Sequence, residues 1–276
     1  MQEAQYIERI RNYYFNSRFG YRYLLWGSQH FGFYPENKHI SEKEAQALMQ
    51  DLIAKKLNLS NSMKVLDAGC GRGIVANYLA NKFGCSIEAI DITPMLVEEA
   101  RARNLNTLNV NFSLMDYSNM GFSNNYFDAI YTIESLCHSF DIKKTLREFY
   151  RVLKKGGKVT FFEYTIAEDD KFSYYEKDIL RKVIIGTATN EGLLRFRHGK
   201  FQDLIKKVGF RKVDIDDITR NVIPSLNRLR KYFFVPYFFV KLSNSQEKNP
   251  NPTIAIEWYK LMKKGLWKYN IFTTFK

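Results

Sequence analysis

One stretch decides the fold of this chain: Val65-Leu66-Asp67-Ala68-Gly69-Cys70-Gly71-Arg72-Gly73. An apolar run ends in an acidic residue, and glycine then stands at every second position up to the start of a helical pattern at residues 74–83. Glycine permits a tight turn and lets a ligand approach the backbone closely, so the stretch is typical of a strand that leads through a binding loop into a helix. The spacing G-x-G-x-G differs from the G-x-G-x-x-G of dinucleotide-binding folds.

Acidic side chains follow this strand and the next two. Asp67 precedes the glycines, Asp91 ends an apolar run at residues 86–90, and Asp116 follows one at residues 110–114. A carboxylate beside the turn would repel a diphosphate but attract a cationic amino group. Asp91 can accept from both hydroxyls of a ribose, and Asp116 from an adenine amino group. The set fits S-adenosylmethionine (SAM), which carries an ammonium and a positive sulfonium. We expect the cofactor site to contain Asp67, Ala68, Gly69, Cys70, Gly71, Gly73, Asp91, Ile92, Asp116, Tyr117 and Ile133.

The remaining pattern alternates between strands and helices. Strands are expected at residues 63–67, 86–90, 110–114, 127–133, 158–164, 212–218 and 271–275, and helices at 6–15, 41–57, 74–83, 94–103, 142–153 and 199–208. Ser41 and Glu44 form the capping box that opens the second of these helices. Alternation of this kind predicts an α/β fold with a parallel sheet that helices cover on both faces.

We expect a single domain over residues 1–276, with four parts. Residues 1–60 would form a helical, aromatic N-terminal cap, residues 61–218 the SAM-binding core, and residues 269–276 the last strand. Residues 219–268 lie between two expected strands and are too long for an ordinary hairpin connection. They are expected to form a helical insertion that covers the substrate as a lid.

The positive charge of the chain lies in its last third. The chain has 42 Lys and Arg against 29 Asp and Glu, a net charge of +13, and residues 181–276 account for all of this excess. Such asymmetry indicates an anionic partner or a solvated basic surface. Basic and aromatic residues interleave over residues 227–240. We favour a lid that covers an apolar substrate, and the same segment could contact an anionic membrane surface.

Other classes of protein are disfavoured. The longest apolar run, residues 232–240, is shorter than the ~20 residues of a spanning helix and contains Pro236. The first residues lack the apolar region of a secretion signal. Cys70, Cys85 and Cys137 are too few for a disulfide framework or a zinc site, and no metal-ligand cluster is visible. We expect a cytoplasmic protein that associates peripherally with membranes if the basic segment binds them.

Several motifs resemble those of one enzyme family. They are Trp26-Gly27-Ser28-Gln29-His30-Phe31-Gly32-Phe33-Tyr34, Tyr131-Thr132-Ile133-Glu134-Ser135-Leu136-Cys137-His138, residues 146–157, and Glu163-Tyr164. From Trp26 to Ile166 the chain resembles class I SAM-dependent methyltransferases, especially sterol 24-C-methyltransferases and the related tocopherol and small-terpenoid enzymes. Sterol enzymes carry an acidic Y-E-Y-G-W-G motif where residues 22–27 have no acid.

The resemblance implies a Rossmann-like, seven-stranded, mostly parallel sheet with helical caps. It also implies SAM as cofactor and S-adenosylhomocysteine as product. Methyltransferases that act on nucleic-acid amino groups usually show N/D-P-P-[YF] after the fourth strand, where this chain has Ile133-Glu134-Ser135-Leu136. We therefore expect no nucleic-acid partner.

Three residues are candidates for acid/base or cation-stabilising roles: Glu134, His138 and Glu163. If Glu134 begins a helix, it shares one face with His138 at i,i+4 spacing. The alternatives are that Glu134 contacts the helix dipole or the cofactor amino group, that His138 is a packing residue, and that Glu163 is a structural acid. The expected substrate pocket contains Tyr23, Trp26, His30, Phe31, Tyr232 and Phe233.

These residues predict methyl transfer to a small apolar or amphiphilic acceptor. The favoured reaction is C-methylation of an isoprenoid, sterol-like or lipid-like substrate. N- or O-methylation of a small natural product or amine is the alternative, and a non-catalytic SAM-binding protein is the third.

Overall fold

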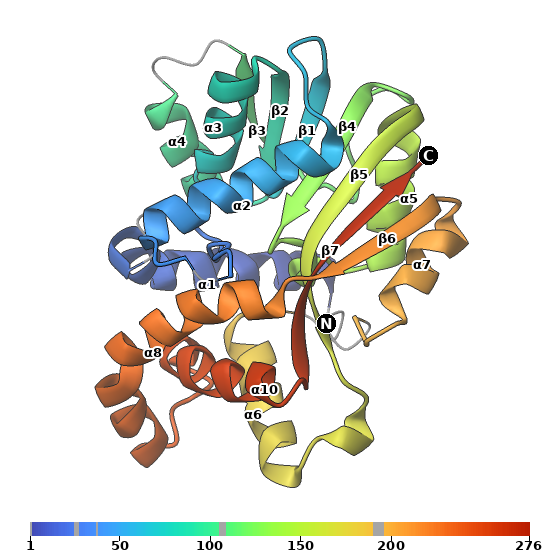
Figure 1. Cartoon of the computed structure of the whole chain (residues 1–276). Coiled ribbons are helices and arrows are strands. Elements are labelled where there is room, and N and C mark those ends of the chain that lie inside the picture. Colours follow the sequence, from blue (N-terminus) through green and yellow to red (C-terminus); the bar gives the residue numbers. More distant parts are fainter. Residues whose placement is uncertain (1, 25–27, 37, 105–108, 190–195) are drawn as a thin grey trace.

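A seven-stranded sheet forms the centre of the computed structural model, which describes residues 2–24, 28–36, 38–104, 109–189 and 196–276 (Figure 1). Its strands are β1 (Lys64–Ala68), β2 (Ser86–Asp91), β3 (Val110–Leu114), β4 (Phe127–Ile133), β5 (Leu153–Ile166), β6 (Arg211–Asp217) and β7 (Trp267–Phe275). The order is β3-β2-β1-β4-β5-β7-β6. β1 to β5 pair in parallel, and β7 is antiparallel to both β5 and β6. The predicted Rossmann-like, mostly parallel sheet is confirmed.

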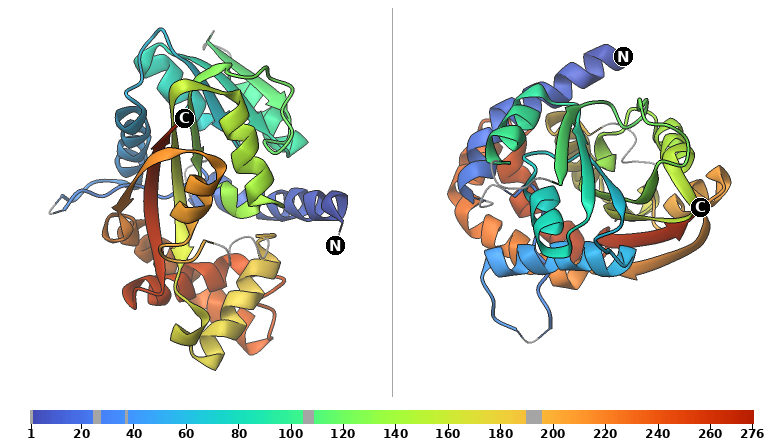
Figure 2. Two further views of the ribbon diagram at one scale, coloured as in Figure 1. Left: turned by 90° about the vertical axis from the view of Figure 1, so that its right-hand side faces the viewer. Right: turned by 90° about the horizontal axis from the view of Figure 1, so that it is seen from above.

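Helices cover both faces of this sheet. They are α2 (Glu42–Leu57), α3 (Ile74–Phe83), α4 (Pro94–Arg103), α5 (Ile142–Val152) and α7 (Phe201–Val208). Figure 2 shows α2 and α3 on one face and α5 and α7 on the other. The Ser41–Glu44 capping box is present at the start of α2. α5 buries Ile142, Leu146, Phe149 and Val152, the i, i+4, i+7 spacing that places apolar side chains on one side of a helix.

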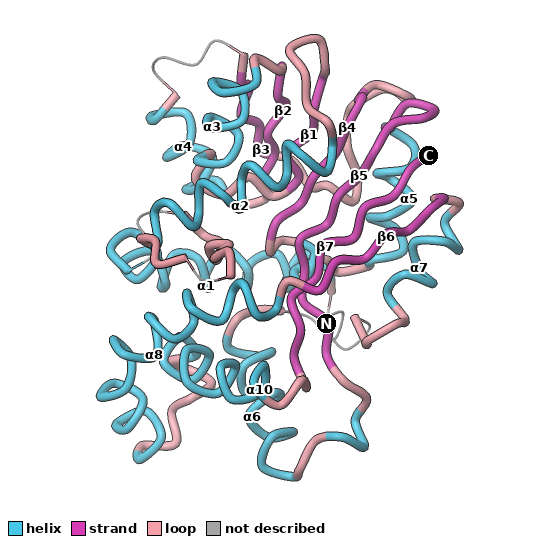
Figure 3. Tube along the Cα trace, viewed as in Figure 1, coloured by secondary structure: helices cyan, strands magenta, loops and turns pink. Residues whose placement is uncertain are grey.

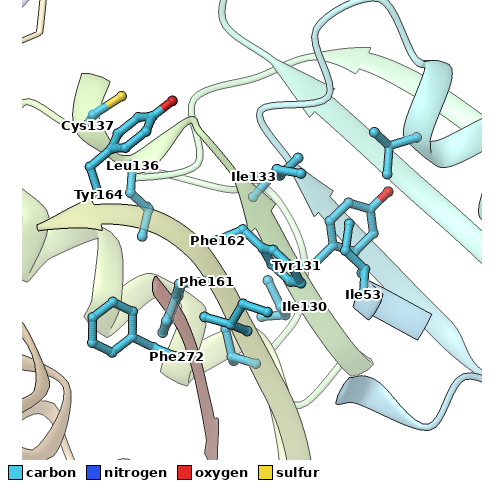
Figure 4. Close-up of a cluster of buried hydrophobic side chains, with 14 of the residues drawn as sticks. Ile53, Ile130, Tyr131, Ile133, Leu136, Cys137, Phe161, Phe162, Tyr164 and Phe272 are labelled. Atoms are coloured by element: carbon cyan, nitrogen blue, oxygen red, sulfur yellow. The ribbon is translucent and has the colours of Figure 1, made fainter. Parts of the chain in front are cut away.

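Large apolar side chains fill the space between the sheet and its helices. Figure 4 shows Ile130, Phe161 and Phe272 from three adjacent strands, which share one face of the sheet. Phe162, Tyr131 and Ile53 of α2 lie on the other face, because neighbouring residues of a strand point to opposite sides. Phe161 and Phe162 are fully buried, and burying one such side chain stabilises the fold by about 1.5–3 kcal/mol. This packing makes a rigid platform under the residues that follow β4 and β5.

A second group of helices lies beyond the carboxyl ends of the strands. It contains α6 (Tyr174–Gly186), α8 (Thr219–Leu242), α9 (Pro250–Thr253), the π-helical turn η4 (Ile254–Trp258) and α10 (Tyr259–Lys263). Figure 3 shows that only β5 and β7 extend from the sheet toward this group. α1 (Glu3–Leu24) crosses between the sheet and these helices (Figure 1).

Several element boundaries differ from those predicted. α1 continues nine residues past Phe15, because its buried face repeats through Tyr6, Ile10, Tyr13 and Ser17. The last strand begins at Trp267, not at Ile271, because β7 pairs with β5 from Trp267 opposite Ile166 to Phe275 opposite Lys158. α6 belongs to this second group of helices, which we call the lid helices, although its residues were expected to form part of the SAM-binding core.

No helix in the described ranges is both long enough and apolar enough to cross a bilayer.

Candidate active site

The glycine turn after β1 is held by the backbone of β2. The amides of Gly69 and Cys70 both donate to the Ile90 carbonyl at 2.9 Å. Gly71 has φ +51°, and a Cβ there would lie 1.9 Å from Gln29 Oε1. A Cβ at Gly69 would lie 2.5 Å from the Ser135 side chain. Both glycines lie in the left-handed region, at φ +91° and +51°, and at Gly69 an added side chain would also collide with Ser135.

Asp91 connects this turn to the end of β2. Its Oδ2 accepts from the Gly71 amide at 2.9 Å and its Oδ1 accepts from the Thr93 amide at 2.8 Å. Burial raises the pKa of the Asp91 carboxyl above its usual value, and the two amides oppose that rise. At the end of β3, Asp116 Oδ1 accepts from the Ser118 amide at 2.7 Å. Two carboxylates thus reach the same edge of the sheet.

A first pocket opens between this edge and α1. It encloses about 950 Å³ of empty space, part of it open to solvent. α1 contributes Tyr6, Ile10 and Tyr14 to its lining. The helix is held across the pocket, because Tyr6 donates to the Ala188 carbonyl at 2.7 Å and Arg11 to the Ile92 carbonyl at 3.1 Å.

Most of the expected cofactor residues line this first pocket. They are Gly69, Cys70, Gly71, Asp91, Ile92, Asp116, Tyr117 and Ile133. Asp67, Ala68 and Gly73 do not line it, because they lie in the packed layer behind the turn. Asp67 accepts from the Tyr131 hydroxyl at 2.7 Å, and burial raises its pKa to about 7. A Cβ at Gly73 would lie 2.6 Å from the Phe112 ring, so this glycine serves the contact between helix and strand.

The pocket's polar groups suit S-adenosylmethionine. Four lining residues, Ser28, Gln29, Thr93 and Ser118, carry buried side-chain atoms that have no hydrogen-bond partner within the described ranges. A buried polar atom without a partner is unfavourable unless a ligand or water satisfies it. Asp91 and Asp116 would accept from the ribose and adenine groups, and the glycine turn leaves room for the methionine part. Ser28, Gln29 and Ser118 were not predicted as ligands, because nothing in their local pattern marks them.

A second pocket adjoins the first. It encloses about 810 Å³, solvent space included. The two pockets share Tyr14, Gln29, His30, Glu134 and His138. Eight of the other thirteen lining residues are aromatic or aliphatic, and they come from α1, the segment after it, β5, α8 and η4: Tyr13, Phe31, Tyr164, Leu229, Phe233, Ile254, Ala255 and Trp258. The remaining five are Gly20, Cys137, Thr187, Thr189 and Asn251. A reacting group could therefore pass from one pocket to the other at the five shared residues.

Glu134 stands at this junction in a strained backbone position. Its φ is +51°, and its amide donates to the Phe162 carbonyl at 2.9 Å. Oε1 accepts from the Phe31 amide at 2.9 Å and from the Tyr269 hydroxyl at 3.0 Å, and Oε2 accepts from the Tyr164 hydroxyl. Burial raises its pKa to about 7 despite these donors. A buried carboxyl that titrates near neutrality can serve as a proton acceptor.

His138 reaches the junction from the turn that follows Glu134. Its Nε2 lies 3.0 Å from the Tyr14 hydroxyl and its Nδ1 lies 3.4 Å from the Ala188 carbonyl. Burial lowers its pKa to about 4, so the ring is neutral near pH 7. Because Ala188 offers only an acceptor, the network assigns the proton to Nδ1 and leaves Nε2 to accept from Tyr14.

Glu134 does not begin a helix, so the condition for i,i+4 spacing with His138 is not met. The left-handed backbone of Glu134 prevents a helix there, and a 3₁₀ turn, η1 (Leu136–His138), follows. Glu134 and His138 are therefore brought together by the shared wall of the two pockets rather than by helical spacing.

Glu163 lies behind the junction and lines neither pocket. Its Oε1 accepts from the amides of Ser135 and Leu136 at 2.8 and 2.6 Å, and burial raises its pKa to about 8. Through Oε1 the carboxyl holds the η1 turn, so the structure does not place Glu163 together with Glu134 and His138. The structural alternative considered for this acid fits the geometry.

The expected substrate residues divide into two groups. His30, Phe31 and Phe233 line the second pocket. His30 has both ring nitrogens engaged, with the Phe31 carbonyl at 2.8 Å and Gln50 at 3.2 Å. Tyr23 and Tyr232 are 61% and 56% exposed and line neither pocket, because they lie on the outer sides of their helices. Trp26 lies outside the described residues.

Sequence reasoning missed most of the second pocket. Tyr14, Tyr164, Leu229 and Trp258 come from four elements far apart in the chain. Their only local signal was the aromatic richness of the first helix and of the lid. Within the described ranges, no group of three His, Cys, Asp or Glu side chains is placed to hold a metal ion.

Comparison with known proteins agrees with this geometry. Residues 66–161 match the family described as a methyltransferase domain. An S-adenosyl-L-methionine-dependent Diels-Alderase from Talaromyces variabilis is 33% identical over 84% of this chain and 83% of that protein. Squalene methyltransferase 1 from Botryococcus braunii is 29% identical over 80% of this chain and 57% of that protein.

The fold is also found in solved structures. A mycolic acid cyclopropane synthase complexed with S-adenosylhomocysteine has a TM-score of 0.83, with 16% identity over 98% of each chain. At this identity the likeness supports the fold alone. Membership of this family makes S-adenosylmethionine the cofactor of this enzyme. The chain belongs to the class I S-adenosylmethionine-dependent methyltransferases.

Proposed function

We propose that this enzyme transfers a methyl group to a carbon atom of an apolar acceptor of the isoprenoid, sterol-like or lipid-like class. One observation carries the proposal: a cofactor pocket and a largely apolar pocket meet at Glu134 and His138. The acceptor's carbon skeleton would contact Phe31, Leu229, Phe233 and Trp258, whereas the reacting carbon would lie near the junction.

The chemistry requires an acceptor of positive charge and of a proton. When bound, the cofactor supplies an electrophilic methyl group. Attack by an alkene of the acceptor forms a carbon–carbon bond as the methyl–sulfur bond breaks, and positive charge develops on the neighbouring carbon. Loss of a proton from an adjacent carbon then restores the double bond.

Residues at the junction suit each of these needs. The ionised Glu134 carboxylate would stabilise the positive charge, and the faces of Tyr14 and Tyr164 would add about 0.5–2 kcal/mol each if they lie beside it. Glu134 in its ionised form would accept the proton directly, or His138 would accept it through the Tyr14 hydroxyl that donates to its Nε2. α1 and the lid helices would hold the acceptor in place and keep water away.

The test uses cofactor carrying a carbon-13 methyl group and a panel of polyisoprenoid alkenes, sterol precursors, phenols and amines. The expected product has the labelled methyl on carbon, which its carbon-13 shift identifies, together with one S-adenosylhomocysteine per product. A label found only on nitrogen or oxygen would overturn carbon methylation and support the N- or O-methyl alternative. Cofactor binding without any product across the panel and in cell extract would support a non-catalytic role.

A second candidate is cyclisation of a polyunsaturated acceptor without methyl transfer. The relative from Talaromyces variabilis favours it, since that protein is a SAM-dependent Diels-Alderase. The same experiment separates the two reactions. Cyclisation would give a product of unchanged mass and no S-adenosylhomocysteine, whereas methyl transfer gives both a mass increase and that by-product.

A further inference from the structure

The second half of α8 presents an apolar surface to solvent. Six large side chains on it are between 56% and 75% exposed: Tyr232, Phe234, Val235, Phe238, Phe239 and Leu242. We refer to these six residues as the α8 patch. Single exposed apolar side chains are ordinary on protein surfaces, but a contiguous group of this kind marks an interaction site.

The opposite side of this helix is fixed to the rest of the protein. Leu229 and Phe233 line the second pocket, and Tyr237 donates to the buried Glu257 carboxylate in η4. The Tyr237 hydroxyl also lies 3.3 Å from that of Tyr175 in α6. The α8 patch is therefore the outer face of an anchored helix. Figure 1 places the second half of α8 at the outer edge of the group of lid helices, away from the sheet.

The charges on the helix that carries the patch have one sign. The sequence of α8, Thr219–Leu242, contains five Lys or Arg and no Asp or Glu. Lys231 and Lys241 flank the patch and are exposed. Tyr174, at the start of α6, is 91% exposed beside Tyr175, and Lys241 lies 5.5 Å from the Tyr175 ring. An apolar centre with cations at its ends is the pattern of a helix that lies in the interface of an anionic bilayer.

We propose that the α8 patch docks on the surface of an anionic lipid bilayer. From Tyr232 to Leu242 the helix rises about 16 Å, which is too short to cross the ~30 Å hydrocarbon layer. It would lie along the surface, with the aromatic side chains among the acyl chains and the lysines at the headgroups. An acidic protein is the less favoured partner, because the centre of the patch carries no cation for its carboxylates to meet.

Docking there would also serve the acceptor pocket, a consequence that rests on the proposed function. The α8 patch and the lining residues Leu229 and Phe233 belong to one helix. An apolar acceptor dissolved in the bilayer would then be beside the lid that covers its pocket.

The test is co-sedimentation of the full chain with vesicles of phosphatidylcholine, alone and with about one third phosphatidylserine, at low and high salt. The variant F234S/F238S/F239S removes three aromatic side chains of the patch, none of which lines a pocket. Its matched control, F15S/L114S/I215S, removes three exposed apolar side chains from α1, β3 and β6. K231E/K241E reverses the flanking charges, and K206E/K207E makes the same change in net charge on α7, where both lysines are exposed.

We expect wild type to bind the anionic vesicles and to dissociate at high salt. F234S/F238S/F239S and K231E/K241E should each lower the partition coefficient about tenfold or more, whereas both controls stay within about threefold of wild type. Calorimetry with SAM confirms that each variant is folded, because the cofactor pocket is untouched.

Absence of wild-type binding, or equal losses in variants and controls, would overturn the proposal. Binding of an acidic acyl carrier protein through the same residues, without vesicle binding, would overturn it in favour of protein docking. Because the readout is lipid binding, the result does not depend on which acceptor is methylated.

Discussion

The two pockets of this enzyme are built by the chain in different ways. The first is lined mainly by residues close to strand ends between Gly69 and His138, within the charge-balanced part of the sequence, and α1 covers it. The second draws its walls from α1, β5, α8 and η4, and much of this lining belongs to the aromatic lid. The cofactor pocket therefore depends on local backbone geometry, whereas the acceptor pocket depends on how distant segments pack together.

The largest effect is expected at Glu134, where the two pockets meet. Glu134→Gln should lower turnover by a factor of about 10² to 10⁴ because it removes both the charge and the proton acceptor. Cofactor affinity should change far less. Calorimetry with SAM and steady-state assays measure the two quantities separately. Equal losses in binding and turnover would mean that Glu134 belongs to the cofactor pocket alone.

The pH profile sharpens the same comparison. Turnover that needs ionised Glu134 should rise with pH through about 7, where burial places its pKa. Tyr269→Phe removes a donor to the ionised carboxylate, which raises that pKa further and moves the rise to higher pH. A rise near pH 4 that survives Glu134→Gln would instead assign the proton acceptor to His138.

Gly71→Ala tests the local geometry of the cofactor pocket. The new Cβ would collide with Gln29 and strain a left-handed backbone, so SAM affinity should fall at least about tenfold. Gly156→Ala is the matched control, because its φ is also positive, at +77°, but no atom lies within 4 Å of the added carbon. Similar affinity losses in both variants would contradict the prediction, because Gly156 does not line the cofactor pocket.

Glu163 on β5 and Glu176 on the lid helix α6 test how a carboxyl contributes to stability in the sheet and in the lid. Burial raises the pKa of Glu163 from 4.5 to about 8, so the folded protein holds this proton more tightly than the unfolded chain. The contribution of this proton to the free energy of unfolding is fully present below about pH 4.5, and it is lost as the pH rises through about 8. Unfolding free energy should therefore fall over this range by up to about 1.4 kcal/mol per pH unit relative to Glu163→Gln.

Glu176 in α6 should behave in the opposite way. The hydrogen bond from Lys264 lowers its pKa to about 2, so its contribution is present above about pH 4.5 and is lost as pH falls through about 2. Urea unfolding between pH 3 and 9 compares Glu163→Gln with Glu176→Gln. The same pH dependence in both variants would contradict the difference between the two environments.

The smallest effect is expected at two equivalent helix caps, one on a helix that covers the sheet and one on a lid helix. Ser41 with Glu44 caps α2, and Ser173 with Glu176 caps α6. Replacing either serine by alanine should cost about 1 kcal/mol. Ser41→Ala should lower the global unfolding free energy, whereas Ser173→Ala should chiefly speed hydrogen exchange in α6. A purely global effect of Ser173→Ala would show that the lid and the core unfold together.

The core was readable because its signals are local. Residues 74–83 and 94–103 form helices and residues 110–114 and 127–133 form strands with the predicted bounds, since hydrophobic period, glycine and proline act within a few residues. Asp91 and Asp116 line the pocket as expected because strand ends converge at one edge of a parallel sheet. Tyr232 was misplaced beside Phe233 because adjacent residues of a helix point in different directions, and only packing decides which one faces inward.

The sequence by itself determined the order of strands and helices in the sheet and its covering layers, the glycine turn, and two of the acids of the cofactor pocket, but not the helix α6. Tertiary structure alone decided the rest. It turned Glu134 into a left-handed position under three donors from separate segments, moved Glu163 behind the pocket wall, and joined α6 to the lid. The physical reason is range: backbone turns depend on neighbouring residues, whereas the burial that sets a carboxyl's pKa comes from segments more than 100 residues apart.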